Sequence, residues 1–124
     1  MSVQNILDTC RHSTDGCDIV AFGDYRSLLI LRSSHQAHLR REALDALTAE
    51  AATLFEQLDA IANADRATTP LLTGASFNGK KALAFARSEI SASEFICLTG
   101  SFSISVQEVL RLAARTLQDV EAAA

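Results

Sequence analysis

The chain is poor in the residues that mark specialised folds. It has 124 residues with no tryptophan, one proline, five glycines and three cysteines. A small, odd number of cysteines does not make a disulfide framework, so we expect a reducing, cytoplasmic setting. No apolar run approaches the roughly 20 residues that span a bilayer, and the polar start Met1–Asn5 lacks the pattern of a secretory signal. We therefore expect neither membrane insertion nor secretion.

Basic charge is scarce as well. The chain has 11 Lys and Arg against 15 Asp and Glu, and a net charge of −4. Basic residues are adjacent only at Arg40–Arg41 and Lys80–Lys81. Nucleic-acid binding needs a concentrated basic face, so we expect none here. The 48% hydrophobic and 21% charged content is typical of a globular chain, and the length fits a single domain over residues 1–124.

The patterns of catalytic, metal and cofactor sites are also missing. Cys10 and His12 lie two residues apart in an expected helix, so their side chains point in different directions. His35 and His38 supply only two metal ligands, and no C-x-x-C pair is present. Gly79 before a lysine follows a hairpin signal and does not open a helix, so it is no phosphate loop. We expect no catalytic, metal-binding or cofactor-binding residues, and no enzyme.

What the chain does have is the periodicity of a mixed helix and sheet domain. The first segment, Ser2–His12, reads as a short helix capped by Ser2. Two apolar runs follow, Cys17–Gly23 and Ser27–Arg32, and the short gap between them predicts an antiparallel hairpin. Neither run alternates polar with apolar residues. Strands of that kind belong in the middle of a sheet covered on both faces.

A long amphipathic helix is predicted over His35–Asn63. Large apolar residues and one alanine recur three and four positions apart, at Leu44, Leu47, Ala51, Leu54, Leu58 and Ile61. Ser33 and Gln36 have the spacing of a capping box, which predicts the start of the helix. Further alanines leave much of its surface without bulk: Ala37, Ala43, Ala46, Ala49 and Ala52. This surface lets another backbone approach closely.

The second half predicts a hairpin, a strand and a helix. Asn78-Gly79 is a strong hairpin signal between the runs Leu71–Phe77 and Lys80–Arg87. Pairing outward from that turn sets Phe77 opposite Lys80, Ala75 opposite Ala82, Thr73 opposite Ala84 and Leu72 opposite Phe85. The small residues Gly74, Ala75, Ala82 and Ala84 make the hairpin thin, which leaves room for a helix to lie close.

The chain then continues with a fifth strand, Phe95–Thr99, and a last helix that ends near Val120. Ser105 and Glu108 have the spacing of a capping box at the start of this helix. A mostly antiparallel five-stranded sheet with helices on both faces buries every apolar surface described so far.

This order of elements resembles the roadblock family of dynein light chains and their prokaryotic relatives. The residues that carry the resemblance are Asn5-Ile6-Leu7, the hairpin Asp18–Ser33, the alanine-rich helix Glu42–Leu58, the Asn78-Gly79 hairpin, the strand Phe95–Thr99 and the helix Val106–Val120. One difference is that the first hairpin has no glycine after Asp24, where that family often has one. The resemblance implies an α/β (α+β) fold, the profilin-like α/β/α sandwich.

The resemblance also implies a non-catalytic homodimer or heterodimer that acts as an adaptor. Its long helix would pair with that of its mate, and the strand after that helix would extend the sheet edge to edge. The residues implied at this interface are Ala43, Ala46, Leu47, Glu50, Thr53, Leu54, Leu72, Thr73 and Ala75. A small Ras-like GTPase, or a scaffold around one, is the implied partner.

Two other functions fit the same sequence. A secretion-chaperone-like dimer is also a small acidic α/β protein, and it would need an exposed apolar groove. A small-molecule sensor would need a cavity, for which the thin surface of Gly74, Ala75, Ala82 and Ala84 leaves room. The sequence names neither the partner nor a pathway.

Overall fold

The computed structural model describes residues 2–35, 40–64, 72–79, 81–88 and 93–123. The elements follow the order α1 (Val3–Ser13), β1 (Cys17–Asp24), β2 (Leu29–Ser34), α2 (Arg41–Ala64), β3 (Thr73–Asn78), β4 (Lys81–Arg87), β5 (Glu94–Gly100) and α3 (Val106–Ala123). No helix in this described part is long and apolar enough to span a bilayer.

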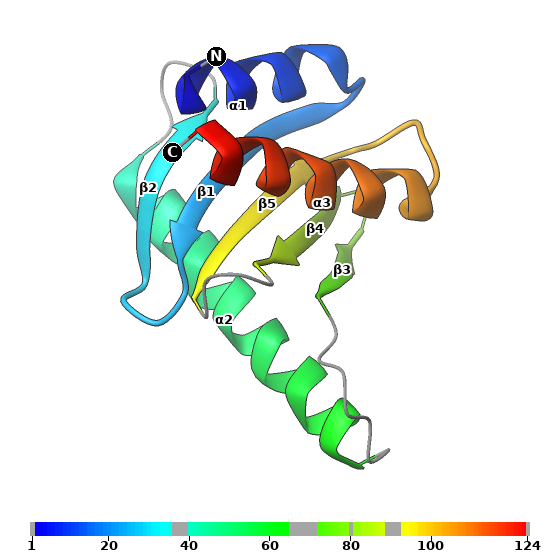
Figure 1. Ribbon diagram of the computed structural model, residues 1–124. Coiled ribbons are helices and arrows are strands. Elements are labelled where there is room, and N and C mark those ends of the chain that lie inside the picture. The colour runs from blue at the N-terminus through cyan, green and yellow to red at the C-terminus, as the bar shows by residue number, and fades with distance from the viewer. Residues whose placement is uncertain (1, 36–39, 65–71, 80, 89–92, 124) are drawn as a thin grey trace.

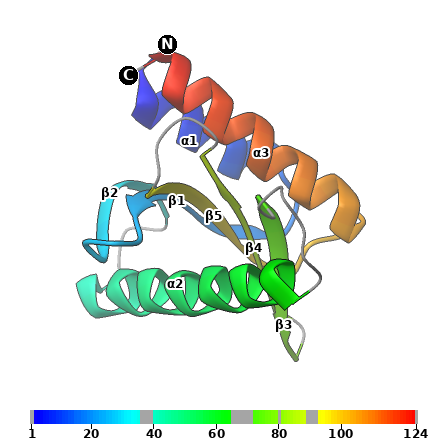
Figure 2. The same ribbon diagram turned by 60° about the horizontal axis from the view of Figure 1, so that its bottom comes forward.

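The five strands form one sheet in the order β2-β1-β5-β4-β3, and all neighbouring strands are antiparallel. Helix α2 lies across one face, and α1 and α3 lie side by side on the other (Figures 1 and 2). The predicted sandwich with a five-stranded sheet and helices on both faces is therefore confirmed. Strands β2 and β3 form the two edges of the sheet.

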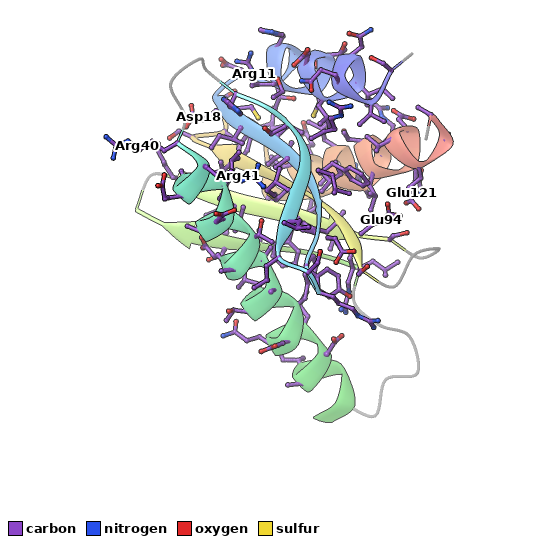
Figure 3. All side chains as sticks on the ribbon, turned by 90° about the vertical axis from the view of Figure 1, so that its left-hand side faces the viewer. Arg11, Asp18, Arg40, Arg41, Glu94 and Glu121 are labelled. Atoms are coloured by element: carbon purple, nitrogen blue, oxygen red, sulfur yellow. The ribbon has the colours of Figure 1, made fainter. Side chains whose placement is uncertain are left out.

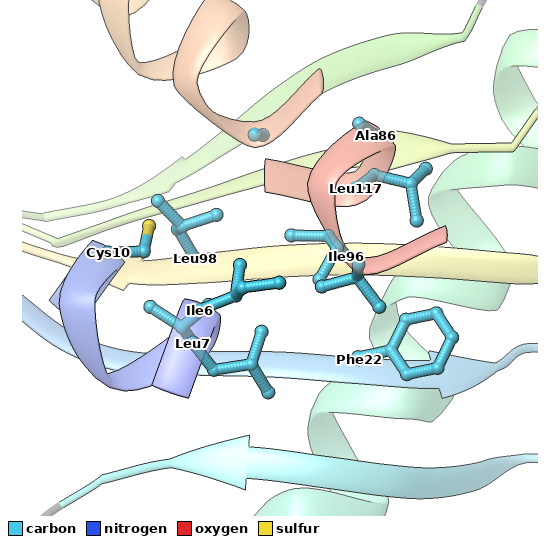
Figure 4. Packing of buried hydrophobic residues seen from close by; sticks show 11 residues of the cluster. Ile6, Leu7, Cys10, Phe22, Ala86, Ile96, Leu98 and Leu117 are labelled. Carbon is cyan, nitrogen blue, oxygen red and sulfur yellow. The ribbon is translucent and has the colours of Figure 1, made fainter. Parts of the chain in front are cut away.

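The core has two halves, one on each face of the sheet. Alternate residues of the central strands point to opposite faces, so Val20 and Phe22 of β1 pack under α1 and α3 while Ala21 faces α2. Figure 4 shows the first half, where Ile6 and Leu7 of α1 meet the sheet and α3. Strand β1 is therefore apolar on both faces because both faces are covered, as predicted.

The prediction of a central position is wrong for the second apolar run. Strand β2 is an edge strand, and of its apolar residues only Ile30 is buried, beneath α2, while Leu29 and Leu31 are exposed. An apolar run indicates burial on both faces only if another strand covers its free side. In this fold β1 pairs with β5 on its other side, which leaves β2 at the end of the sheet.

The predicted start of the long helix is also wrong. Strand β2 continues through Ser33 and Ser34, which pair with Ala21 and Val20, and α2 begins only at Arg41. Ser33 therefore cannot cap a helix, because its backbone belongs to the sheet. Gln36 and Ala37 lie outside the described residues. The predicted caps Ser2 and Ser105 are confirmed, since their side-chain oxygens accept the backbone N–H of Asn5 and of Glu108, each at 3.2 Å.

The register of the second hairpin differs from the prediction by two residues. Asn78 pairs with Lys81, Phe77 with Ala82, Ala75 with Ala84 and Thr73 with Ala86. The tight turn therefore begins with Gly79, which has a φ of +63°. A glycine at the first central position is compatible with a type II′ turn, so the chain need not use Asn78 there. Because the shift is even, every side chain keeps its predicted face.

The thin hairpin does bring α2 close, as predicted. A Cβ at Gly74 would lie 2.7 Å from Cζ of Phe85 and 3.3 Å from Cδ1 of Leu58 on α2. Glycine is thus the residue that lets β3 pass beneath the C-terminal half of α2.

Candidate functional site

One side of α2 carries the helical residues expected at an interface. The buried side of the helix consists of Leu44, Thr48, Ala51 and Phe55. The six implied residues lie next to it at spacings of three and four: Ala43, Leu47 and Leu54 are half-buried, and Ala46, Glu50 and Thr53 are exposed. The structure therefore brings these six together on one continuous, small-residue surface, which we call the α2 surface.

Ile61 extends the α2 surface toward the end of the helix. It follows Leu54 by seven residues and is exposed. The apolar stripe predicts Ile61 in the core, and that prediction is wrong. Helix α2 extends beyond the edge of the sheet in Figure 1, so the stripe is longer than the sheet it covers.

The three remaining implied residues lie at the β3 edge. Leu72, Thr73 and Ala75 are half-buried there. Thr73 and Ala75 face α3, because Gly74 between them faces α2, whereas Leu72 precedes the strand. The implied interface is therefore divided between the α2 surface and the β3 edge.

The β3 edge also has an apolar hollow, at the thin surface of the hairpin where the sequence leaves room for a cavity. A cavity of about 190 Å³ lies between β3 and the start of α3, lined by Ala75, Phe77, Ala84, Ile104 and Val106. Phe77 is 62% exposed at its rim. The alternation of β3 placed Phe77 on the α3 side, but exposure there depends on where α3 begins, which the strand pattern does not contain.

A second apolar edge lies at the opposite end of the sheet. Leu28, Leu29 and Leu31 are exposed on β2 and on the turn before it. Figure 3 looks onto this edge, with Arg11 on α1 and Arg41 at the start of α2. The run of leucines was the available signal, but its lack of alternation favoured an interpretation as core.

An arginine anchors the C-terminal half of α2 to the sheet. Nη2 of Arg87 on β4 donates to Oδ1 of Asp59 at 2.6 Å, and its guanidinium lies 5.3 Å from the ring centre of Phe55. Phe55 in turn packs edge-to-face against Phe85, with ring centres 4.7 Å apart. Since the Arg87 side chain is buried, this contact and the aromatic packing fix the position of the α2 surface.

The thiols are placed for packing. Cys10 accepts a hydrogen bond from Oγ1 of Thr116 at 3.5 Å in the core, whereas His12 is exposed and contacts Arg11. The structure therefore keeps Cys10 and His12 apart. Burial raises the pKa of Cys97 and of Cys17 to about 12, which keeps both thiols protonated at neutral pH and unsuited to nucleophilic attack.

The acidic residues of α2 form a solvated face. Glu42, Asp45, Glu50, Glu56 and Asp59 are exposed, as expected. Within the described ranges, no three His, Cys, Asp or Glu side chains converge as metal ligands would. His38 lies outside those ranges. The arrangement of exposed apolar edges and a small-residue helix surface is suited to binding another protein.

The solved structures place this fold with the roadblock domains. No protein-family profile matches the chain, and no curated protein matches its sequence. A Roadblock/LC7 domain from Streptomyces avermitilis superposes with a TM-score of 0.77 at 9% identity, over 98% of this chain and 97% of that one.

Two further structures refine the likeness. An MglB with tetrameric arrangement superposes with a TM-score of 0.78 at 13% identity, over 98% of this chain and 87% of that one. A profilin from Schizosaccharomyces pombe gives 0.58 at 13% identity, over 98% and 97%. The roadblock resemblance and the profilin-like α+β fold are thereby confirmed, at identities that support the fold alone.

Proposed function

We propose that residues 1–124 act as a single roadblock-like domain that forms a cytoplasmic, non-catalytic homodimer and serves as an adaptor for a partner protein. The observation that carries the proposal is the α2 surface, where six residues of the implied interface lie side by side. Small residues such as Ala43 and Ala46 allow two helices to approach closely. Half-buried Leu47 and Leu54 supply apolar area that a second copy would cover.

The β3 edge supports the same proposal. An edge strand with an exposed aromatic residue is a liability for a monomer, and pairing with a second copy removes it. Leu72, Thr73 and Ala75 would then be covered from the neighbouring strand. The similar MglB has a tetrameric arrangement, so a chain of this fold assembles in at least one other protein.

The roadblock resemblance supplies the class of partner. In that family the partner is often a small Ras-like GTPase or its scaffold, and we extend that expectation to this chain. The acidic face of α2, with Glu42, Asp45 and Glu56 exposed, would contribute steering toward a basic partner surface. The adaptor donates no catalytic group in this proposal.

Sedimentation tests the dimer. We expect the wild type to sediment as a dimer at micromolar concentration and Thr53→Arg to sediment as a folded monomer, because the exposed Thr53 side chain lies on the α2 surface. Thr9→Arg is the matched control, since Thr9 is also an exposed helical threonine but lies on α1 across the sheet. A monomeric wild type would refute the proposal, and so would a dimer that both variants leave intact.

Affinity capture followed by mass spectrometry tests the partner. A small GTPase or its scaffold recovered with the wild type supports the adaptor function. A secreted effector would favour the chaperone-like dimer, for which the hollow at Phe77 is the exposed groove required. A metabolite retained in native mass spectrometry would favour the sensor.

A further inference from the structure

The β2 edge is open along only part of its length. At the end of the strand, Nε2 of Gln4 donates to the carbonyl of Ser33 at 3.0 Å, and Nε of Arg11 donates to Oγ of Ser34 at 2.8 Å, so α1 covers this end. No described strand pairs with the outer side of β2. The stretch Leu28–Arg32, which we call the β2 strip, therefore presents backbone and side chains to solvent.

The side chains of the β2 strip are unusually apolar for an edge. Leu28, Leu29 and Leu31 are 48%, 47% and 51% exposed. Soluble proteins protect edge strands with charges or proline, because an exposed apolar edge recruits other chains. Only Ile30 of this run contributes to the core. The exposed leucines thus contribute little to the core. Together with the free backbone groups beside them, they can bind an added strand.

The backbone conformation of Leu28 also favours a binding role for the β2 strip. Leu28 has a φ of +59°, a conformation that costs a leucine free energy and that glycine or asparagine adopts readily. The turn itself is held by Asp24, whose Oδ1 accepts the backbone N–H of Arg26 at 2.9 Å and of Ser27 at 3.1 Å. The turn therefore has no need of a leucine side chain, and a strained residue with an exposed side chain is typical of a binding position.

A β-bulge directs a second leucine outward. The register between β1 and β2 shifts between Phe22 and Gly23, and Leu31 has no partner on β1. Bulges re-aim side chains and shorten the length of strand available for pairing. The β2 strip is consequently suited to a short segment.

The charge around the β2 strip defines the chemistry of that segment. Arg26 and Arg32 flank the leucines, both are exposed, and neither has an ion-pair partner among the described residues. The chain has no acidic residue from Tyr25 to Arg41, and the acidic side chains of α2 that line a hollow with Arg26 are Glu56 and Asp59. An occupant with carboxylates at its ends would complement both arginines. A second copy would instead bring the arginines of both strips into one short stretch, which is repulsive.

We propose that the β2 strip binds a short extended segment of a partner protein, apolar at alternate positions and acidic at its ends, which adds to the sheet as a sixth strand beside β2. This site lies at the opposite edge of the sheet from β3 and does not depend on the dimer, although Leu28 lines a hollow together with Thr53 of the α2 surface. A chain with both surfaces would hold its own copy at one edge of the sheet and a partner segment at the other.

Selection from a displayed library of random peptides tests the proposal. The wild type is expected to enrich acidic–apolar alternating sequences. Hydrogen exchange should then show slower exchange of backbone amides within the β2 strip when a selected peptide is bound. The double variant Leu29→Thr, Leu31→Thr keeps side chains that are compatible with a strand. It should bind the selected peptide about tenfold or more weakly, because the apolar contacts are lost. Phe77→Thr, at the opposite edge, is the matched control and should bind normally.

Charge reversal checks the chemistry of the occupant. Arg26→Glu with Arg32→Glu should weaken acidic peptides and favour otherwise identical peptides that carry lysine at their ends. Selected peptides that bind the double leucine variant as well as the wild type would overturn the proposal, as would a library without any enriched alternating sequence.

Two further measurements separate the other possible occupants. Co-sedimentation with phosphatidylserine vesicles, compared with phosphatidylcholine vesicles, detects an anionic membrane surface as the ligand. Sedimentation of the double leucine variant alone detects a second copy. Leucine-dependent binding to the anionic vesicles would overturn the assignment to a peptide, and so would a smaller assembly of the variant.

Discussion

Leu28 is the residue at which stability and binding are most clearly in conflict. Its φ of +59° costs a leucine about 1–2 kcal/mol, while its half-exposed side chain returns little packing energy. Folding alone would favour asparagine or glycine at this position, whereas binding at the β2 strip would favour the leucine side chain.

We predict that Leu28→Asn raises the free energy of unfolding by about 0.5–1 kcal/mol, because asparagine accepts the left-handed conformation at lower cost. Urea denaturation measures the change. Leu29→Asn is the control, since Leu29 is equally exposed but has no positive φ, and it should not stabilise the fold. A loss of stability in Leu28→Asn would mean that the leucine packs more than its exposure indicates.

Asp59 links stability to pH. The side-chain hydrogen bond from Arg87 lowers the pKa of Asp59 below its usual 3.8, so the ionised form is favoured in the folded state. The resulting stabilisation is present above the unfolded pKa and is lost as pH falls through the folded pKa. Because the Asp59 side chain is 53% exposed, solvent screening limits this contribution to about 1 kcal/mol or less.

We predict that Asp59→Asn lowers the free energy of unfolding at neutral pH by about 1 kcal/mol. As pH falls from about 5 to about 3, the variant should lose less stability than the wild type does. Urea denaturation over that pH series measures both effects. Asp24 and Asp8 also have lowered pKa values through their hydrogen bonds, so the variant should keep part of the acid sensitivity. Parallel curves for wild type and variant would show that the Arg87 contact does not stabilise the ionised form.

Helix α2 and the hairpin of β3 and β4 depend on one close approach. Gly74 allows Phe85 and Leu58 to meet over β3, and a Cβ there would lie 2.7 Å from Cζ of Phe85. This contact couples the position of the α2 surface to the β3 edge, which are the two parts of the proposed dimer interface.

We predict that Gly74→Ala destabilises the fold by about 1–2 kcal/mol, since the ring of Phe85 has to move within a packed core. Denaturant unfolding measures the loss. Phe85→Leu removes the far end of the ring, so the double variant should be more stable than the sum of the two single losses predicts. Additive losses would show that the side chain at residue 74 finds room elsewhere.

Local patterns were enough to predict most elements, and long-range pairing decided the rest. The caps at Ser2 and Ser105 and the amphipathic stripe of α2 from Leu44 to Leu58 depend on neighbours in sequence, and they were predicted correctly. The edge position of β2 depends on β5 pairing with β1, far later in the chain, as the partners Val20 and Leu98 show, and no local pattern contains it. For the same reason the shared face of the α2 residues could be predicted, whereas the exposure of Leu29 and Phe77 could not.

The two edges of the sheet differ in shape and charge, and each is suited to a different partner. The β3 edge is continuous with an apolar hollow and is flanked by the small-residue side of α2, which suits a second copy. The β2 edge is bordered by Arg26 and Arg32, which have no ion-pair partner in the described part of the chain, and this disfavours self-pairing. One copy and one foreign segment can therefore bind a single sheet without competing for a strand.

A dimer of this kind should make stability depend on protein concentration. Anything that binds the folded chain and not the unfolded one raises the unfolding temperature, and a second copy does so by mass action. We predict that the midpoint of thermal unfolding rises with concentration for the wild type and for Thr9→Arg, but stays constant for Thr53→Arg. The Leu29→Thr, Leu31→Thr variant should keep the wild-type dependence, because the β2 strip is not part of the dimer. Differential scanning calorimetry over a roughly hundredfold range of concentration measures all four. If the unfolding midpoint of the Leu29→Thr, Leu31→Thr variant did not depend on concentration, both edges would belong to one self-association surface. The assignment of different partners to the two edges would then be wrong.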